Sequence, residues 1–147
     1  KGIELTLENL SFRKVRSPKN VQAILQTTEK MTYLQKKLLY MDGSVGALDI
    51  TYILPELGKR FGPQLKKQMT FPVLKEHGIL LGQIEATIEC TRADYEMSRH
   101  LEVPLGQPLI SYCYTAYAQE ETPILYGETI SRADRFCYSL SLTCASS

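Results

Sequence analysis

The stretch that decides the fold of this chain runs Pro123-Ile-Leu-Tyr-Gly-Glu-Thr-Ile-Ser-Arg-Ala-Asp-Arg-Phe-Cys-Tyr-Ser-Leu140. Its alternate residues form two different rows: Ile124, Tyr126, Glu128, Ile130 and Arg132 in one, and Leu125, Gly127, Thr129 and Ser131 in the other. Successive side chains of a β-strand point to opposite faces, so two such rows are typical of a strand. We predict a strand that ends at the corner Arg132-Ala-Asp-Arg135, with a second short extended run after it.

Two hairpins are predicted from similar patterns. The Tyr-rich run from Leu109 to Ala118 also alternates, and the short polar segment Glu120-Glu-Thr-Pro123 joins it to the strand above. Antiparallel neighbours permit so short a connection. Tyr33 to Met41 and Ala47 to Leu54 flank Asp42-Gly43, and Asp-Gly between two apolar runs is a strong hairpin signal.

The remaining elements are predicted from caps and periodicity. They are an extended segment at Ile3 to Leu7, a helix over 18–28 with Ser17 as its N-cap, short helical turns at 55–62 and 70–74 with Thr70 capping the second, a strand from Gln83 to Thr91, and a helix from Thr91 to Leu101 capped by Thr91. Hairpins, short loops and interspersed helices predict an α+β fold, an antiparallel β-sheet with helices packed against it. With no linker or repeat in between, residues 1–147 are expected to form a single domain.

Composition narrows the function classes. The formal net charge of +1 gives no overall basic field of the kind that holds nucleic acid or a membrane surface. The 4 cysteines are widely spaced, with no C-x-x-C and no histidine at ligand spacing, so we expect reduced thiols and neither a metal site nor a disulfide framework. No apolar run is long enough to span a bilayer.

Four stretches in order resemble the UTRA domain, the effector-sensing half of HutC-type GntR transcription regulators. They are the basic strand and turn Lys37-Leu-Leu-Tyr-Met-Asp-Gly43, the strand holding Glu85, the segment Ala93-Asp-Tyr-Glu-Met-Ser-Arg-His-Leu-Glu-Val-Pro-Leu-Gly-Gln-Pro108, and the corner Arg132-Ala-Asp-Arg-Phe136. Four weak motifs in the right order are more specific than any one of them. The chain departs from the usual pattern in two places: the family usually has Arg in the basic hairpin strand, where this chain has Lys37 and then Leu39, and it has Gly where this chain has Ala133.

The resemblance implies a chorismate lyase-like fold with an effector pocket between the sheet and its covering helices. It also implies a cytoplasmic homodimer that binds a small polar metabolite, such as a sugar phosphate or an organic acid. In the family, DNA is contacted only through an N-terminal winged-helix domain, which this chain does not contain. The resemblance implies no catalytic residue, no cofactor, no metal and no membrane partner.

The expected ligand-binding residues are Lys37, Glu85, Tyr114, Glu128, Ser17 and Arg132. Lys37 suits an anionic group, and the carboxylates would accept hydrogen bonds from hydroxyls or an amine. Plainer alternatives remain open: Lys37 as a solvated lysine, Glu85 as an exposed residue, Glu128 paired with Arg132, and the tyrosines as simple packing residues. At the corner, an ion pair between Asp134 and Arg135 is expected to have a structural role.

Two other functions compete with sensing. A chorismate lyase-type enzyme, which releases pyruvate from chorismate, needs a basic clamp for two carboxylates beside an acidic residue. The sequence offers Lys37, Arg132 and Glu85 or Glu128, but not paired arginines. A stand-alone binding module without a role in gene regulation is the third possibility.

Overall fold

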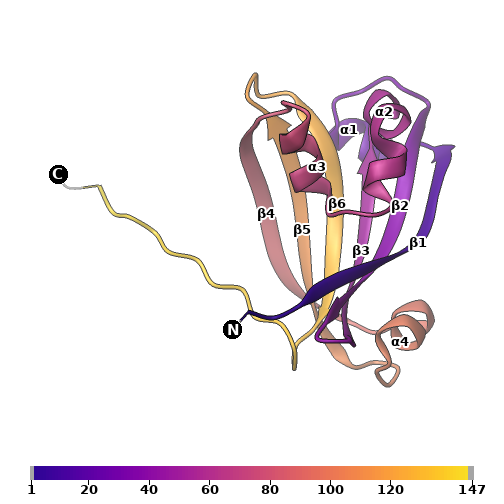
Figure 1. Cartoon of the computed structure of the whole chain (residues 1–147), viewed down its shortest axis with the longest axis vertical. Coiled ribbons are helices and arrows are strands. Elements are labelled where there is room, and N and C mark those ends of the chain that lie inside the picture. Colours follow the sequence, from indigo (N-terminus) through magenta and orange to yellow (C-terminus); the bar gives the residue numbers. More distant parts are fainter. Residues whose placement is uncertain (1, 146–147) are drawn as a thin grey trace.

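Six strands form one antiparallel sheet in the computed structural model, which describes residues 2–145 (Figure 1). The strands are β1 (Leu5–Arg16), β2 (Met31–Met41), β3 (Ser44–Ile53), β4 (Leu81–Arg92), β5 (Pro108–Ala118) and β6 (Pro123–Arg132). They lie in the order β1-β2-β3-β6-β5-β4, so β1 and β4 are the two edges. The predicted α+β fold and the predicted pairing of β5 with β6 are confirmed.

The Asp42-Gly43 hairpin is confirmed, with one irregularity. Asp42 and Gly43 both have positive φ, 50° and 81°, as a two-residue turn of type I′ requires. Strand β3 begins at Ser44 rather than at the predicted Ala47. Tyr40 pairs with Val45 but Leu39 pairs with Ala47, so Gly46 is an extra residue, a β-bulge.

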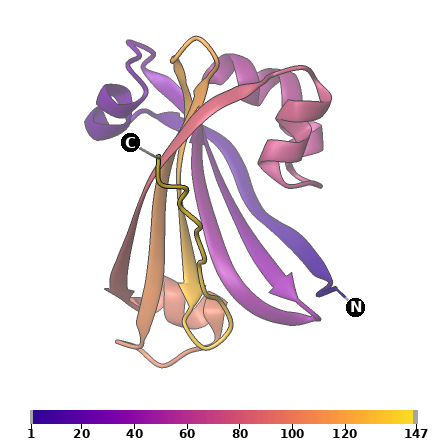
Figure 2. The same ribbon diagram turned by 90° about the vertical axis from the view of Figure 1, so that its left-hand side faces the viewer.

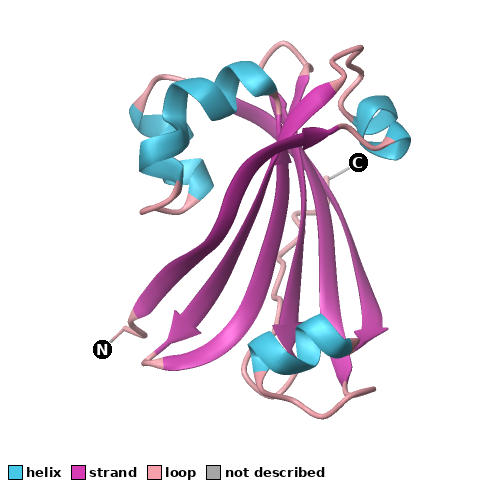
Figure 3. Ribbon diagram, turned by 90° about the vertical axis from the view of Figure 1, so that its right-hand side faces the viewer, coloured by secondary structure: helices cyan, strands magenta, loops and turns pink. Residues whose placement is uncertain are grey.

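Helices cover both faces of the twisted sheet. Helices α2 (Pro55–Leu65) and α3 (Thr70–Glu76) lie on one side and α1 (Lys19–Ile24) on the other, as the two edge-on views show (Figure 2, Figure 3). Helix α4 (Tyr95–Leu101) packs near β3 at the opposite end of the sheet. In the part of the chain that the structure describes, no helix has the length and apolar character needed to cross a membrane.

The predicted caps of three helices are wrong, because each side chain has another partner. Ser17 precedes the N-cap of α1, which is Pro18, and its hydroxyl donates to Thr32 Oγ1 (3.3 Å). Thr70 lies inside α3, and its hydroxyl accepts from a lysine of the sheet. Thr91 stays in β4, so Asp94 caps α4 instead and accepts from the Met97 N–H at 2.8 Å.

Apolar residues gather in two cores, one on each face of the sheet. We call the face that carries Lys37, Asp49 and Tyr114 the front face, and the other the back face. The front-face core joins the sheet to α2 and α3 and includes Ile53, Phe61, Leu65, Val73, Leu74, Ala116 and Leu125. The back-face core joins the sheet to α4 and includes Leu38, Leu48, Leu101, Leu109 and Ile130. Burial of these side chains is the main stabilising term of the fold.

Helix α2 is longer than the predicted turn at 55–62, even though Pro63 lies inside it. Pro55 at the first position fits a helix start, and Glu56 in the first turn complements the helix dipole. Phe61 and Leu65, each at most 2% exposed, anchor the helix on the front face. Tertiary burial therefore carries the helix through two glycines and a proline.

Candidate functional site

A cavity of about 180 Å³ opens on the front face, where α3 begins above the middle of the sheet. Its lining is mostly apolar and aromatic, with a few polar groups, as in most small-molecule sites. The lining residues are Leu39, Asp49, Met69, Thr70, Phe71, Pro72, Tyr112, Tyr114 and Thr129. Strands β2, β3, β5 and β6 therefore supply one wall, and the start of α3 supplies the other.

Asp49 is the only carboxylate among these lining residues. It is 6% exposed and lies in the middle of β3. The hydroxyl of Thr129 donates to its Oδ1 at 2.8 Å, and the hydroxyl of Thr51 donates to its Oδ2 at 3.2 Å. Burial raises the pKa of Asp49, and these hydrogen bonds and the charge of Lys37 oppose that rise only in part. The cavity thus contains a strong hydrogen-bond acceptor, the Asp49 carboxylate, whose ionisation is opposed by its burial.

Lys37 lies across the strand from Asp49 and is fully buried, so the solvated alternative is wrong. Its Nζ donates to the Gln68 carbonyl and to Thr70 Oγ1, both at 3.1 Å. Burial lowers the pKa of Lys37, and the nearby Asp49 charge opposes this shift. Because Thr70 lines the cavity, Lys37 sits directly behind the cavity wall.

Tyr114 forms one wall of the cavity because its partner across the strands is a glycine. It pairs with Gly127, and a Cβ built at Gly127 would lie 2.6 Å from the Tyr114 hydroxyl oxygen. The ring packs edge-on against Phe71, with centroids 5.9 Å apart. Burial and the Asp49 charge raise the pKa of Tyr114, so it remains a neutral phenol.

A second, larger groove adjoins the cavity. Its volume is about 530 Å³, and Phe71 and Pro72 separate it from the cavity by lining both. The other lining residues are Lys75, Ile79, Leu80 and Leu81.

Two expected site residues, Glu85 and Glu128, lie on the back face and do not approach the cavity. Glu85 on the edge strand accepts from the Tyr117 hydroxyl at 2.7 Å. Glu128 accepts from the Ser111 hydroxyl, which replaces the alternative pairing with Arg132. Strand alternation separates both carboxylates from Lys37 by the thickness of the sheet.

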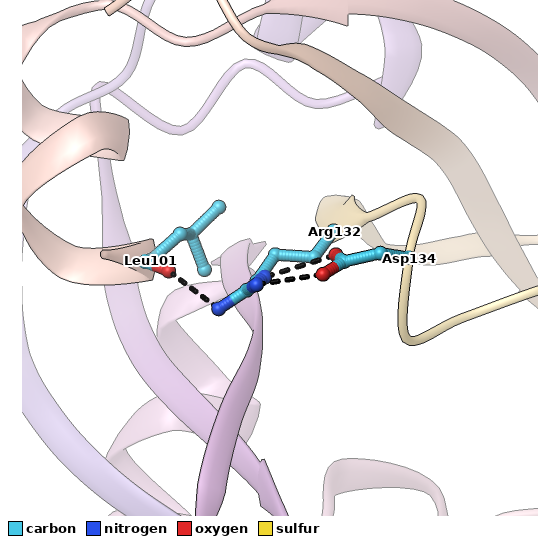
Figure 4. A network of polar contacts seen from close by, with 3 residues as sticks. All are labelled: Leu101, Arg132 and Asp134. Carbon is cyan, nitrogen blue, oxygen red and sulfur yellow. Dashed lines mark hydrogen bonds and ion pairs between the residues drawn. The ribbon is translucent and has the colours of Figure 1, made fainter. Parts of the chain in front are cut away.

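Arg132 and Ser17 are also remote from the cavity. Arg132 donates from Nε and Nη2 to the two carboxylate oxygens of Asp134, at 3.0 and 2.7 Å, and from Nη1 to the Leu101 carbonyl at 3.5 Å (Figure 4). The corner ion pair is thus Arg132–Asp134 and not Asp134–Arg135, because the side chain of Arg132 returns over the turn. Ser17 bonds to Thr32, which is five residues before Lys37 on β2.

The predicted set therefore separates: the structure brings Lys37 and Tyr114 together, and the other four lie elsewhere. Sequence reasoning missed Asp49 and Thr129. Their signal was a lone carboxylate within the apolar run Val45 to Ile53, opposite a basic residue of the same hairpin. A buried charge of that kind needs compensating partners, and here the hydroxyls of Thr129 and Thr51 and the charge of Lys37 compensate it only in part.

The comparisons with known proteins agree with the fold described above. The UTRA domain family matches residues 1–137. The ligand-binding domain of a regulator assigned to the GntR family, from Bordetella bronchiseptica, superposes with a TM-score of 0.87 at 17% identity, over 97% of this chain and 91% of that one. No match was found among curated proteins.

PhnF from Mycobacterium smegmatis gives two further matches. Its effector domain superposes with a TM-score of 0.86 at 14% identity, over 97% of this chain and 89% of that one. A second PhnF structure superposes with a TM-score of 0.87 at 15% identity, over 97% of this chain and 64% of that one. The chain belongs to the UTRA domain family, and its fold is that of the effector domains of GntR-family regulators.

Proposed function

We propose that this chain is the effector-binding domain of a GntR-family transcription regulator of the HutC type. In this proposal the front-face cavity binds a small polar metabolite, and binding alters the DNA affinity of a winged-helix domain in the same protein. Family membership and the shared fold support the regulatory role. The domain acts as a homodimer in the cytoplasm, since such regulators generally bind two-fold DNA sites.

The observation that carries the proposal is the pairing of buried Asp49, which lines an aromatic cavity, with buried Lys37 directly behind the cavity wall. Neither charge has a direct ionic partner there: among the described residues the close ion pairs are Lys36–Glu96 and Arg132–Asp134. Buried charges of this kind lose hydration without full compensation. A ligand that supplies the missing partners would recover part of that loss.

The geometry defines the ligand chemistry. A hydroxyl or amino group of the ligand would donate to Asp49, and its ring or carbon skeleton would pack against Tyr112 and Phe71. An anionic group would accept from Lys37 after displacing the hydroxyl of Thr70 or the Gln68 carbonyl. The cavity alone holds a small head group, and the adjoining groove of about 530 Å³ would accommodate the rest.

The cavity fits a sensor better than a chorismate lyase-type enzyme. Chorismate carries two carboxylates, whereas the described residues that line the cavity include no cation: Lys37 lies behind its wall and Lys75 lines the adjoining groove. Asp49 would repel a second carboxylate. Arg132, the other candidate for the clamp, is bound to Asp134 on the back face.

A thermal-shift screen of phosphorylated sugars, amino-acid catabolites and organic acids tests the proposal. A ligand present at a hundred times its dissociation constant stabilises the folded domain by about 2.7 kcal/mol. We expect at least one hit, and we expect Asp49→Asn to abolish its shift while Glu85→Gln on the back face retains it. Hits that bind Asp49→Asn as well as the wild type would contradict the proposed site. Release of pyruvate from added chorismate would favour the lyase instead.

A further inference from the structure

The end of the chain forms an extended arm whose part beyond Tyr138 makes no backbone hydrogen bond among the described residues. After the corner, residues 136–145, here called the C-terminal arm, run outward from the sheet (Figure 1). Leu140 and Leu142 are 72% and 82% exposed. Among the described residues, no backbone hydrogen bond is made by 137–145. The arm therefore has the conformation of a strand without a strand partner.

The sequence of the arm is that of a half-buried strand. Phe136, Tyr138, Leu140 and Leu142 form one apolar row, and small residues with short side chains lie between them. This period-2 alternation is the signal of a strand with one buried face. From Phe136 to Ser147 there is no charged residue. Exposure of such an apolar row to water is unfavourable, so the segment is suited to packing against an apolar protein surface.

Edge strand β4 offers the complementary surface. Residues 82–90 are all exposed, although β4 is 12 residues long and pairs with β5 on one side only. Its front-face row is uncharged and consists of Ile84, Ala86, Ile88 and Cys90. Ile84 and Ile88 are 41% and 49% exposed. Long exposed edges with an apolar row are rare in monomers, because they pair with other chains.

The other edge of the sheet is a poorer surface. Strand β1 carries Arg13 and Lys14 in succession, so charge stands on both of its faces, and it is bent by an irregularity between Asn9 and Ser11. Charges and bulges of this kind protect an edge from pairing. An added strand is therefore expected at β4 and not at β1.

We propose that the C-terminal arm binds β4 of a second copy of this chain, and that the two copies exchange arms about a two-fold axis. Leu140 and Leu142 of the arm face Ile84, Ala86 and Ile88 of the partner, and the backbone of the arm supplies hydrogen-bond partners to the free edge. The part of the arm beyond Tyr138, residues 139–145, spans roughly 23 Å as a strand, which fits within β4. Every arm then has one receiving edge, as an isologous dimer requires. The inference specifies the interface of the homodimer in the proposed function.

The first residues of the arm, Phe136 and Tyr138, pack against their own chain, so the exchanged part of the arm begins after Tyr138. Tyr138 stacks on Tyr112 with ring centroids 4.9 Å apart and planes 8° apart. Phe136 packs against Gly46, where the absence of a side chain leaves room for its ring. Because Tyr112 also lines the cavity, the arm leaves the molecule beside the proposed ligand. This contact would link occupancy of the cavity to the interface.

Analytical ultracentrifugation of the chain and of matched variants tests the inference. Leu140→Ser with Leu142→Ser changes the arm, Ile84→Thr with Ile88→Thr changes the edge, and Leu105→Ser is a control at another exposed leucine, 65% exposed. We expect the wild type and the control to dimerise at micromolar concentration. Each double variant should dimerise at least roughly a hundredfold more weakly, since the two-fold axis doubles the lost apolar contact.

A mixing experiment adds a readout that a nonspecific effect would not give. In a heterodimer, the native arm of the edge variant meets the native edge of the arm variant, whereas a homodimer of either variant has no native contact between arm and edge. A mixture of the two variants should therefore form heterodimers at concentrations where neither variant forms homodimers. All changed side chains are exposed and threonine keeps the β-branch, so the unfolding transition of each monomer should match that of the wild type.

A wild type that remains monomeric would overturn the inference, and so would a mixture that forms no heterodimer. If the arm variant dimerises as tightly as the wild type, the copies meet through another surface. In that case the inference fails while the proposed homodimer stands. Ligand shifts measured on the monomeric variants report on the proposed cavity separately.

Discussion

Lys37 and Asp49 are cross-strand partners at the centre of the sheet, both buried at the cavity and not in direct ionic contact. Burial moves both groups toward neutrality: it lowers the pKa of Lys37 and raises the pKa of Asp49. Titratable groups shifted by burial next to an opposite charge are concentrated at functional sites. The pair therefore has the electrostatic character of a binding site and costs stability when both groups are charged.

The raised pKa of Asp49 predicts a pH-dependent effect of Asp49→Asn. The folded protein holds this proton to a higher pH than the unfolded chain, so the contribution of Asp49 to the free energy of unfolding falls as pH rises through that interval. Asparagine does not ionise and should escape this loss. Urea unfolding should show that the free energy of unfolding of the variant rises relative to that of the wild type between acid and neutral pH. A difference that is independent of pH would contradict the prediction.

Asp134→Asn is the matched control, because the pKa shift of Asp134, and therefore the pH dependence that the variant should show, has the opposite sign to that of Asp49. The hydrogen bonds from Arg132 lower the pKa of Asp134, so its contribution is present above the usual aspartate pKa and is lost as pH falls. The free energy of unfolding of this variant should therefore fall relative to that of the wild type as pH rises. Since Asp134 is exposed, the effect should be small.

Lys37→Met separates ligand binding from folding. Methionine fills a similar volume, and removing the desolvation cost of a buried charge offsets much of the two lost hydrogen bonds, so we expect the free energy of unfolding to change by no more than about 2 kcal/mol. A charge-assisted hydrogen bond is worth about 1.5–3 kcal/mol, so the affinity for an anionic hit should fall at least tenfold. Lys37→Ala should cost about 2 kcal/mol or more of stability, because it leaves a cavity. Calorimetric titration of an anionic hit gives the affinities, and an unchanged value in Lys37→Met would exclude contact with Lys37.

Gly127→Ala should displace the Tyr114 wall of the cavity. A Cβ at this position would meet the Tyr114 ring at 2.7 Å and its hydroxyl oxygen at 2.6 Å, and the ring is held by Phe71 on its other side. Overpacking of this kind costs about 1–3 kcal/mol. Urea unfolding measures the loss, and Gly2→Ala, which meets nothing within 4 Å, is the control. Equal stability of the two variants would show that Tyr114 moves without cost.

Gly46→Ala should disturb the base of the C-terminal arm. A Cβ on this bulge residue would overlap the ring of Phe136. We expect a loss of about 1–3 kcal/mol in the free energy of unfolding. In a double-mutant cycle, Phe136→Ala should relieve most of this loss, with a coupling energy above about 0.5 kcal/mol. Additive effects would place the origin of the loss in the bulge backbone alone.

The sequence by itself determined the sheet, because local chemistry specifies it. Alternation along 109–118 and 123–132, with the short polar loop between them, specified the β5–β6 pair that the structure shows. Asp42-Gly43 specified a turn with two positive φ angles, which few other dipeptides accept without strain. In both cases the information lies within a few residues of the feature.

Only the tertiary structure decided which polar residues meet at the cavity. Without a bulge, the turn at Asp42-Gly43 would place Lys37 opposite Leu48, and Asp49 would point to the back face. The extra residue Gly46 moves the register by one, so Lys37 faces Asp49 instead. A single-residue shift inverts every side chain beyond it. The bulge residue is a glycine because the ring of Phe136, 90 residues further along the chain, occupies the space that a side chain at position 46 would need.

The same physical reason separates the predicted site residues. Lys37, Glu85 and Glu128 lie on three strands whose faces are fixed by register, and register depends on pairings between distant segments. Local patterns specify which residues alternate, but long-range packing decides which row faces the cavity. The sequence therefore determined the strands of this domain, and contacts such as Phe136 against Gly46 decided the composition of its site.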